Sequence, residues 1–181
     1  MSASKTKCMY FNQAQSVDIQ TLDGSKLEVV NDFKYLGSWI GSSVHDIQVR
    51  KALAWKACNA LSKIWKSRLS RSIKERLFQA TVESVLIYGA ESWTMTHRIQ
   101  KQLDGCYTRM LRTAFNISWK DMITNQELYG DLPYLSEKLK ERRLRFAGHC
   151  LRSQKEITSK LILWTHQHGH KKPGRPPTSY V

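Results

Sequence analysis

The chain has 181 residues, with 29 Lys and Arg against 15 Asp and Glu, so its formal net charge is +14 at pH 7. Hydrophobic residues make up 41% of it, enough for an ordinary core, which excludes a chain disordered along its whole length. Apolar runs such as residues 85–88 are far shorter than the roughly 20 residues of a membrane-spanning helix. We therefore expect an intracellular protein with no membrane span.

Residues 1–41 predict a small antiparallel β element of three or four strands. Residues 17–22 alternate apolar and polar side chains, and Asp23-Gly24 suits the tight turn of a hairpin whose second strand is 27–30. A first short strand is expected at 7–11 and a last, continuous one at 33–40. Four Lys and four acids balance within residues 1–37, so the whole net charge belongs to the chain after Gly37.

After this segment apolar residues recur every three or four positions, which is typical of helices that pack on a core. The expected helices are 44–67, 71–88, 96–116, 122–129, 138–151 and 157–164. They predict a helical domain at 42–118, a C-terminal helical segment at 119–168 and a flexible, basic, Pro-rich tail at 169–181. The fold class is therefore mainly α with a small N-terminal antiparallel β element, an α+β chain.

The apolar pattern also predicts which side of each helix faces the core. The first stripe is Leu53, Ala57, Leu61, Ile64 and Trp65; the second is Ile73, Leu77, Phe78, Val82, Val85 and Leu86; the third is Ile99, Leu103, Cys106, Tyr107, Met110 and Ala114. We expect Ser43 to cap the first helix and Gly89 to end the second. The short fourth helix should start near Asp121 or Thr124 and end before Gly130.

The helices carry basic residues with few acids between them. Nine Lys and Arg lie between Arg50 and Arg76, where Glu75 is the one acid, whereas a solvated helix face usually mixes both signs. Such a field favours phosphate contact, and a plain solvated face is the alternative. The candidate contacts are Arg50, Lys51, Lys56, Lys63, Lys66, Arg68, Arg71, Lys74, Arg98, Lys101, Arg109, Arg112, Arg142, Arg143, Arg145 and, in the tail, Arg175.

Aromatic residues lie among these charges. Trp39, Trp55, Trp65 and Trp93 could stack on bases, although Trp55 and Trp65 are expected in the core because both lie near the apolar stripe. Phosphate contacts ignore base identity, so the expected partner is a nucleic acid bound without sequence preference.

The sequence shows no catalytic constellation. It has no Asp-Asp pair of the kind that binds two metal ions and no Gly-rich phosphate loop. His166, His168 and His170 alternate in the tail, downstream of His149-Cys150, but a structural zinc site usually has two closely spaced ligand pairs. We expect no metal, cofactor or small-molecule substrate. The four Cys occur singly, which predicts reduced thiols that fill the core.

Several segments, in this order, resemble one protein family. Residues 4–9 and 32–40, the latter containing Phe33-Lys34-Tyr35-Leu36-Gly37, resemble the end of the palm of reverse transcriptases from LINE-type non-LTR retrotransposons. Residues 78–93 and 103–112 are similar to the thumb of these enzymes. Residues 141–152 and 174–176 are similar to the segment that follows the thumb. The resemblance covers nearly the whole chain as an ordered set.

The resemblance implies roles for these segments. Lys5 and Lys7 would match the Lys-containing motif behind the polymerase site. Phe33, Lys34, Tyr35, Leu36 and Gly37 would match the primer grip, which holds the 3′ end of the primer. The helices of 42–118 would form a thumb-like bundle on the partner, an RNA–DNA hybrid or DNA. The resemblance favours a nuclear over a cytoplasmic location.

Compared with the enzymes of this family, several parts are expected to be missing from this chain. The fingers, the early palm and its catalytic aspartates would precede Ser4, so this fragment is expected not to be an enzyme. Its β segment would expose a palm edge that a protein partner could cover. The alternative is a domesticated, non-enzymatic scaffold that binds a protein or an anionic membrane surface.

Overall fold

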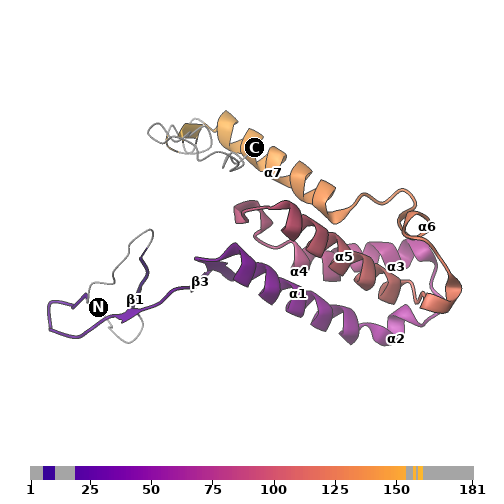
Figure 1. Cartoon of the computed structure of the whole chain (residues 1–181), viewed down its shortest axis with the longest axis horizontal. Coiled ribbons are helices and arrows are strands. Elements are labelled where there is room, and N and C mark those ends of the chain that lie inside the picture. Colours follow the sequence, from indigo (N-terminus) through magenta and orange to yellow (C-terminus); the bar gives the residue numbers. More distant parts are fainter. Residues whose placement is uncertain (1–5, 11–18, 154–156, 158, 161–181) are drawn as a thin grey trace.

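The computed structural model describes residues 6–10, 19–153, 157 and 159–160, and it confirms a mainly helical α+β fold with two small two-stranded sheets (Figure 1). The helical elements are α1 (Ser43–Ala60), α2 (Ser62–Trp65), α3 (Arg71–Phe78), the π-helical η2 (Gln79–Glu83), α4 (Ser84–Leu86), the short η3 (Ala90–Ser92), α5 (His97–Ala114), η4 (Trp119–Asp121), α6 (Asn125–Tyr129) and α7 (Leu135–Arg152).

The helices form a bundle around α5. Helices α1 and α5 contact each other and run in the same direction, while α3 and α4 return behind them (Figure 1). Helix α7 packs on α5 and runs the opposite way. The buried residues of α5 are Leu103, Cys106, Tyr107, Met110, Leu111 and Ala114. This confirms the predicted stripe from Leu103 onward, while Ile99 is partly buried against the same core.

The stripe predicted for the first helix is wrong in part. Leu53 is exposed, and the buried residues of α1 are Asp46, Ile47, Arg50, Ala54 and Cys58. The apolar pattern indicated the wrong side of α1 because two of the residues buried near the start of this helix, Asp46 and Arg50, are charged. The expected single helix 44–67 also ends at Ala60, and α2 follows, so that Trp65 turns back and donates from Nε1 to the carbonyl of Cys58 at 2.8 Å. Ser42, one residue before the expected cap, accepts from the amide of His45.

The second predicted helix is one helical segment with a π-helical insert. Helix α3 passes into η2 and then α4, which ends at Leu86. The turn that follows reaches Gly89, whose φ of +71° suits glycine and marks the break that we predicted there. Phe78, Val82 and Leu86 are buried as expected, whereas Ile73 is exposed. Lys74 and Glu83 are buried instead, which apolar periodicity does not anticipate.

The strand predicted at 33–40 is a hairpin. Leu36 and Gly37 have φ of +48° and +88°, the signs of a two-residue turn, and they separate β3 (Phe33–Tyr35) from β4 (Ser38–Ile40). The antiparallel register pairs Phe33 with Ile40 and Tyr35 with Ser38. The continuous strand was expected because Leu36 is a poor turn former.

The other strands also differ from the all-antiparallel expectation. Strand β1 (Lys7–Cys8) pairs in parallel with β2 (Glu28–Val29). The hairpin expected around Asp23-Gly24 is reduced to one antiparallel bridge between Gln20 and Lys26, with Gly24 at φ +80°.

Some predictions fall outside the described residues. These include Lys5, most of the expected helix 157–164, and the tail with His166, His168, His170 and Arg175. The cysteine prediction is confirmed in the described part, since Cys58, Cys106 and Cys150 are free and buried and Cys8 is half-buried. Among the described helices, none combines the length and apolar character required to cross a bilayer.

Candidate nucleic-acid interface

Asp46 fixes the β3–β4 hairpin to the helices. Its Oδ2 accepts from the hydroxyl of Ser38 and the indole Nε1 of Trp93, both at 2.8 Å, and its Oδ1 accepts from the amide of Trp39 at 3.1 Å. Arg50 lies one helical turn further on, with Nε 3.7 Å from Oδ1. A buried carboxylate with these donors is strongly held, because each bond to a charged group is stronger than a neutral one.

The turn of this hairpin is held by two more side chains. Arg50 donates to the carbonyl of Gly37, and the hydroxyl of Tyr88 donates to the carbonyl of Leu36 at 2.7 Å. The Arg50 guanidinium also lies over the Tyr88 ring, 4.3 Å from its centroid. The primer-grip-like residues are thus placed by α1 and the chain after α4. Phe33, Lys34, Tyr35 and Leu36 remain exposed at the end of the bundle.

The neighbouring helices α1 and α5 carry a basic face, which we call the α1–α5 face. It comprises the basic residues that line two hollows along these helices: Lys51 of α1 and Lys66 just after α2, with Lys101, Arg109 and Arg112 of α5. Each of the two long helices has a single acid. Asp46 is buried under the hairpin, and Asp104 accepts from the amide of Ser136 at the start of α7. Both acids therefore have partners outside this basic set.

A groove of about 410 Å³ lies on this face, between α1 and α5. Lys51 lines it from α1, and Lys101 and Arg109 line it from α5. The remaining lining residues are Val44, Ile47, Gln48, Ile99, Gln102 and Gly105. Three cations and two amides, with no acid among these lining residues, give the groove the donors that phosphate oxygens accept from.

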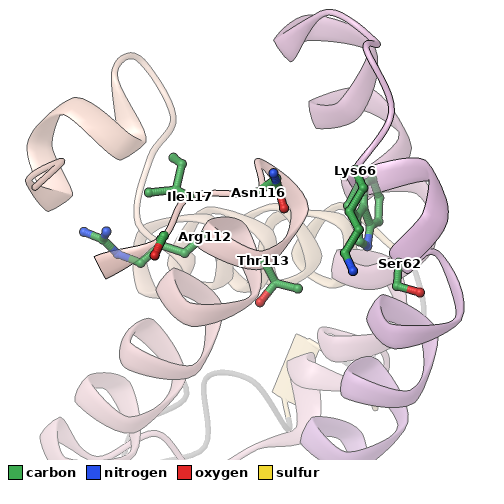
Figure 2. Close-up of a pocket in the computed structure, with 8 residues that line it drawn as sticks. Ser62, Lys66, Arg112, Thr113, Asn116 and Ile117 are labelled. Atoms are coloured by element: carbon green, nitrogen blue, oxygen red, sulfur yellow. The ribbon is translucent and has the colours of Figure 1, made fainter. Parts of the chain in front are cut away.

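A second hollow, of about 270 Å³, lies between α2 and the end of α5 (Figure 2). Ser62 and Lys66 line it from the α2 side, and Thr113 and Asn116 line it from the end of α5. Trp65, Arg112, Ile117 and Ser118 complete the lining. The two hollows therefore place cations at two points along α5.

Some predicted contacts have partners inside the fold. Arg50 is held as described, and Lys74 is buried with Nζ 2.5 Å from the carbonyl of Trp65. Arg71 donates to the carbonyl of Leu128 and lies 4.7 Å from the Phe115 ring centroid. Arg112 donates to the carbonyl of Ile123 at 2.8 Å and to Asn125 at 2.9 Å. These residues position α1, α3, α5 and α6, and Arg112 keeps only part of its donors for a ligand.

The basic residues of α7 are also largely engaged. Lys138 donates from Nζ to Glu83 Oε2 at 2.7 Å, and Arg142 pairs with Glu91. Arg145 pairs with Glu141 on its own helix at 2.6 Å, and Arg143 is half-buried. The first two pairs join α7 to η2 and η3, so this cluster holds α7 in place.

Tyr107 lies between the charged groups of Glu83 and Lys138. The Tyr107 hydroxyl donates to Glu83 Oε2 at 2.5 Å, and it accepts from Lys138 Nζ at 3.2 Å. Burial, followed by the charge of Glu83, raises the pKa of Tyr107 above the ordinary tyrosine value. Burial also raises the pKa of Tyr129. Sequence reasoning missed this network because its members come from three separate helices.

The remaining predicted residues are exposed. Lys56, Lys63, Arg68 and Arg98 point to solvent, as Lys66 and Lys101 do. Trp65 and Trp93 are buried, which excludes them from base stacking in this conformation, and Trp55 is half-buried against the core. Trp119, which the sequence did not single out, is 80% exposed with Lys120 Nζ 5.9 Å from its ring centroid. In the sequence, the position of Trp119 next to Lys120 could have indicated an exposed aromatic residue in a basic surrounding.

Metal ligands do not gather in the described part of the chain, where no group of three or more His, Cys, Asp and Glu side chains could hold an ion. In His149-Cys150, the histidine is exposed and the cysteine is buried. No protein-family model, no curated protein and no solved structure matches this chain.

Proposed function

We propose that this protein binds nucleic acid without sequence preference, through the phosphate backbone, on the α1–α5 face. It does so as a non-catalytic fragment related to the palm end and thumb of a LINE-type reverse transcriptase. The observation that carries the proposal is the face itself: basic side chains from two adjacent helices, with the acid of each helix engaged elsewhere. Lys and Arg contacts of this kind gain affinity by releasing the counterions of the phosphates.

The shape of the face supports phosphate binding over simple solvation. A solvated face keeps its cations spread over a convex surface, whereas Lys51, Lys101 and Arg109 converge on one groove. Gln48 and Gln102 add uncharged donors there. Convergent donors in a groove are suited to one anion held between two helices.

The test is fluorescence anisotropy with a labelled RNA–DNA hybrid across a salt series. The test variant is Lys66→Glu with Lys101→Glu, two exposed positions that line the two hollows of the face. The matched control is Lys140→Glu with Arg145→Glu, two exposed positions on α7 that give the same charge change. For about six phosphate contacts, affinity should fall by roughly three orders of magnitude between about 50 mM and about 200 mM salt.

We expect the Lys66→Glu, Lys101→Glu variant to bind far more weakly than the wild type and the α7 variant to bind nearly as well as the wild type. Equal losses in both variants would mean that only net charge matters, and the α1–α5 face would not be the site. Binding that does not change with salt would contradict backbone recognition altogether. Circular dichroism should show that both variants keep the helical content of the wild type.

A second candidate function is docking of a protein partner on the hairpin. It is favoured by Phe33, Tyr35, Leu36 and Ile40, apolar or aromatic side chains that are exposed together on β3 and β4. Phe33→Lys with Tyr35→Lys should remove cross-links of the hairpin to a partner in cells while leaving affinity for the RNA–DNA hybrid unchanged. Loss of hybrid binding in that variant would assign the hairpin to the nucleic-acid site.

A further inference from the structure

Gly105 stands in the interior of α5, where glycine is among the poorest helix formers. It lies four residues after Lys101 and four before Arg109, so the three positions share one face of the helix. All three line the groove against α1. A glycine at the centre of a basic helical face needs a reason other than helix stability.

The packing of the chain does not supply that reason. A Cβ atom added at Gly105 would meet no atom within 4 Å outside the backbone of its own helix. Gly41, by contrast, has a φ of +118° and would place a Cβ 2.5 Å from the carbonyl oxygen of Asn31. The space above Gly105 is therefore open and belongs to the groove.

The charged groups around this space are placed to share one anion. Arg109 donates from Nε to the carbonyl of Gly105 at 3.2 Å, which directs its guanidinium along α5 toward the glycine. Lys101 flanks the glycine on the other side, and Lys51 lines the groove from α1. The terminal guanidinium nitrogens and both ammonium groups can donate to oxygens of a ligand.

We propose that the groove is a phosphate site in which one phosphodiester of a polynucleotide strand lies directly over Gly105. Lys101 and Arg109 bind it from α5 and Lys51 binds it from α1. The missing side chain lets the phosphate approach the helix backbone closely enough to reach all three cations. This inference rests on the proposed function, and it adds the point at which the strand enters the face. A free phosphate group has the same chemistry, so the test separates the two sources.

The test uses Gly105→Ala and Gly105→Leu in the full chain, with Gly148→Ala in α7 as the matched control. Gly105→Ala should melt about 2–4 °C above the wild type, because alanine favours a helix interior. The gain in Gly148→Ala should be smaller, because its Cβ would lie 3.2 Å from the Arg152 guanidinium, which must move aside. Gly105→Leu should bind the hybrid about tenfold more weakly, and the slope of log affinity against log salt should fall by about one, the loss of one phosphate contact. Gly105→Ala should show a smaller loss, and Gly148→Ala should bind like the wild type.

The outcomes separate this inference from the proposed function. If Lys66→Glu with Lys101→Glu weakens binding while both Gly105 variants keep wild-type affinity and salt slope, the face binds nucleic acid and the phosphate site over Gly105 is overturned. In a second experiment the protein is titrated with inorganic phosphate, and binding is measured by the NMR chemical shifts of the backbone amides of Lys101 and Arg109. Saturable shifts that are lost in Gly105→Leu, without any binding of the hybrid, would support a site for free phosphate and overturn the proposed function.

Discussion

The indole of Trp93 donates a hydrogen bond to the carboxylate of Asp46, a residue 47 positions earlier in the chain, at 2.8 Å. Asp46 is fully buried and Trp93 is nearly so. The same carboxylate binds Ser38 and Trp39 of the hairpin. A single acid thus joins the β segment, the start of α1 and the loop before α5.

Asp46→Ala should destabilise the protein by about 3 kcal/mol or more, because Arg50 loses its buried counter-charge and the Trp93 indole loses its buried acceptor. Urea unfolding followed by tryptophan fluorescence measures this change. Asp131→Ala, at an exposed acid, is the control and should change stability by less than about 0.5 kcal/mol. A loss below about 1 kcal/mol for Asp46→Ala would show that the carboxylate does not hold the hairpin.

Lys138→Ala should cost about 3–5 kcal/mol, because it leaves Glu83 buried without its counter-charge. The side chains of Lys138 and Glu83 are only 16% and 11% exposed. Arg145→Ala removes an exposed pair from the same helix and should cost less than about 0.5 kcal/mol. Chemical denaturation of both variants checks the contrast, and equal costs would contradict the role assigned to Lys138.

The raised pKa of Tyr107 predicts that the folded protein loses stability at alkaline pH. Its pKa is raised in the folded protein by burial and by Glu83, whereas the unfolded chain ionises near the ordinary value of 10.0. Since the unfolded state then releases a proton that the folded state keeps, stability should be constant below about pH 10 and fall above it. Ultraviolet absorbance of tyrosinate, recorded with the folded and the denatured chain, measures the difference. In Tyr107→Phe the alkaline loss should be smaller; an unchanged loss would assign it to other groups.

Leu36→Asn should stabilise the hairpin by up to about 1 kcal/mol. Leu36 has a φ of +48° and is 76% exposed, so the leucine is strained in the turn and little apolar burial is lost. Asn followed by Gly is the favoured pair for this turn. Thermal melting tests the variant, and Gly37→Ala, at φ +88°, should shift the melting temperature downward. A lower melting temperature for Leu36→Asn would contradict the turn geometry.

Affinity for single-stranded nucleic acid should depend on its length, because the two hollows lie a fixed distance apart along α5. The groove at Gly105 and the hollow at Thr113 and Asn116 are 8 to 11 residues apart, or about 12–17 Å at the helical rise. Phosphates along one strand advance about 3.4 Å each, so about four to five nucleotides span the two hollows. Affinity for single strands should rise steeply up to about six nucleotides and slowly beyond. Lys66→Glu should flatten this rise, and a smooth increase in both proteins would exclude a two-point site.

The sequence determined the helices whose start and end depend on near neighbours. Thr96 caps α5, Thr124 and Glu127 cap α6 reciprocally, and Gly130 ends it with a φ of +55°. The acid-poor character of the first and third predicted helices was likewise available from composition. Such features were predictable because a cap bond or a charge count involves residues only a few positions apart.

Only the tertiary structure decided which charges face solvent. Arg50 and Lys74 belong to the same basic run as Lys51 and Lys66, yet the first two are buried and the others line the hollows of the α1–α5 face. Their partners, the carbonyls of Gly37 and Trp65, are backbone atoms that carry no sequence pattern. Lys51 and Gly105 likewise meet only because α1 packs on α5. Burial of a charge depends on acceptors brought from elsewhere in the chain, and periodicity within one helix does not contain that information.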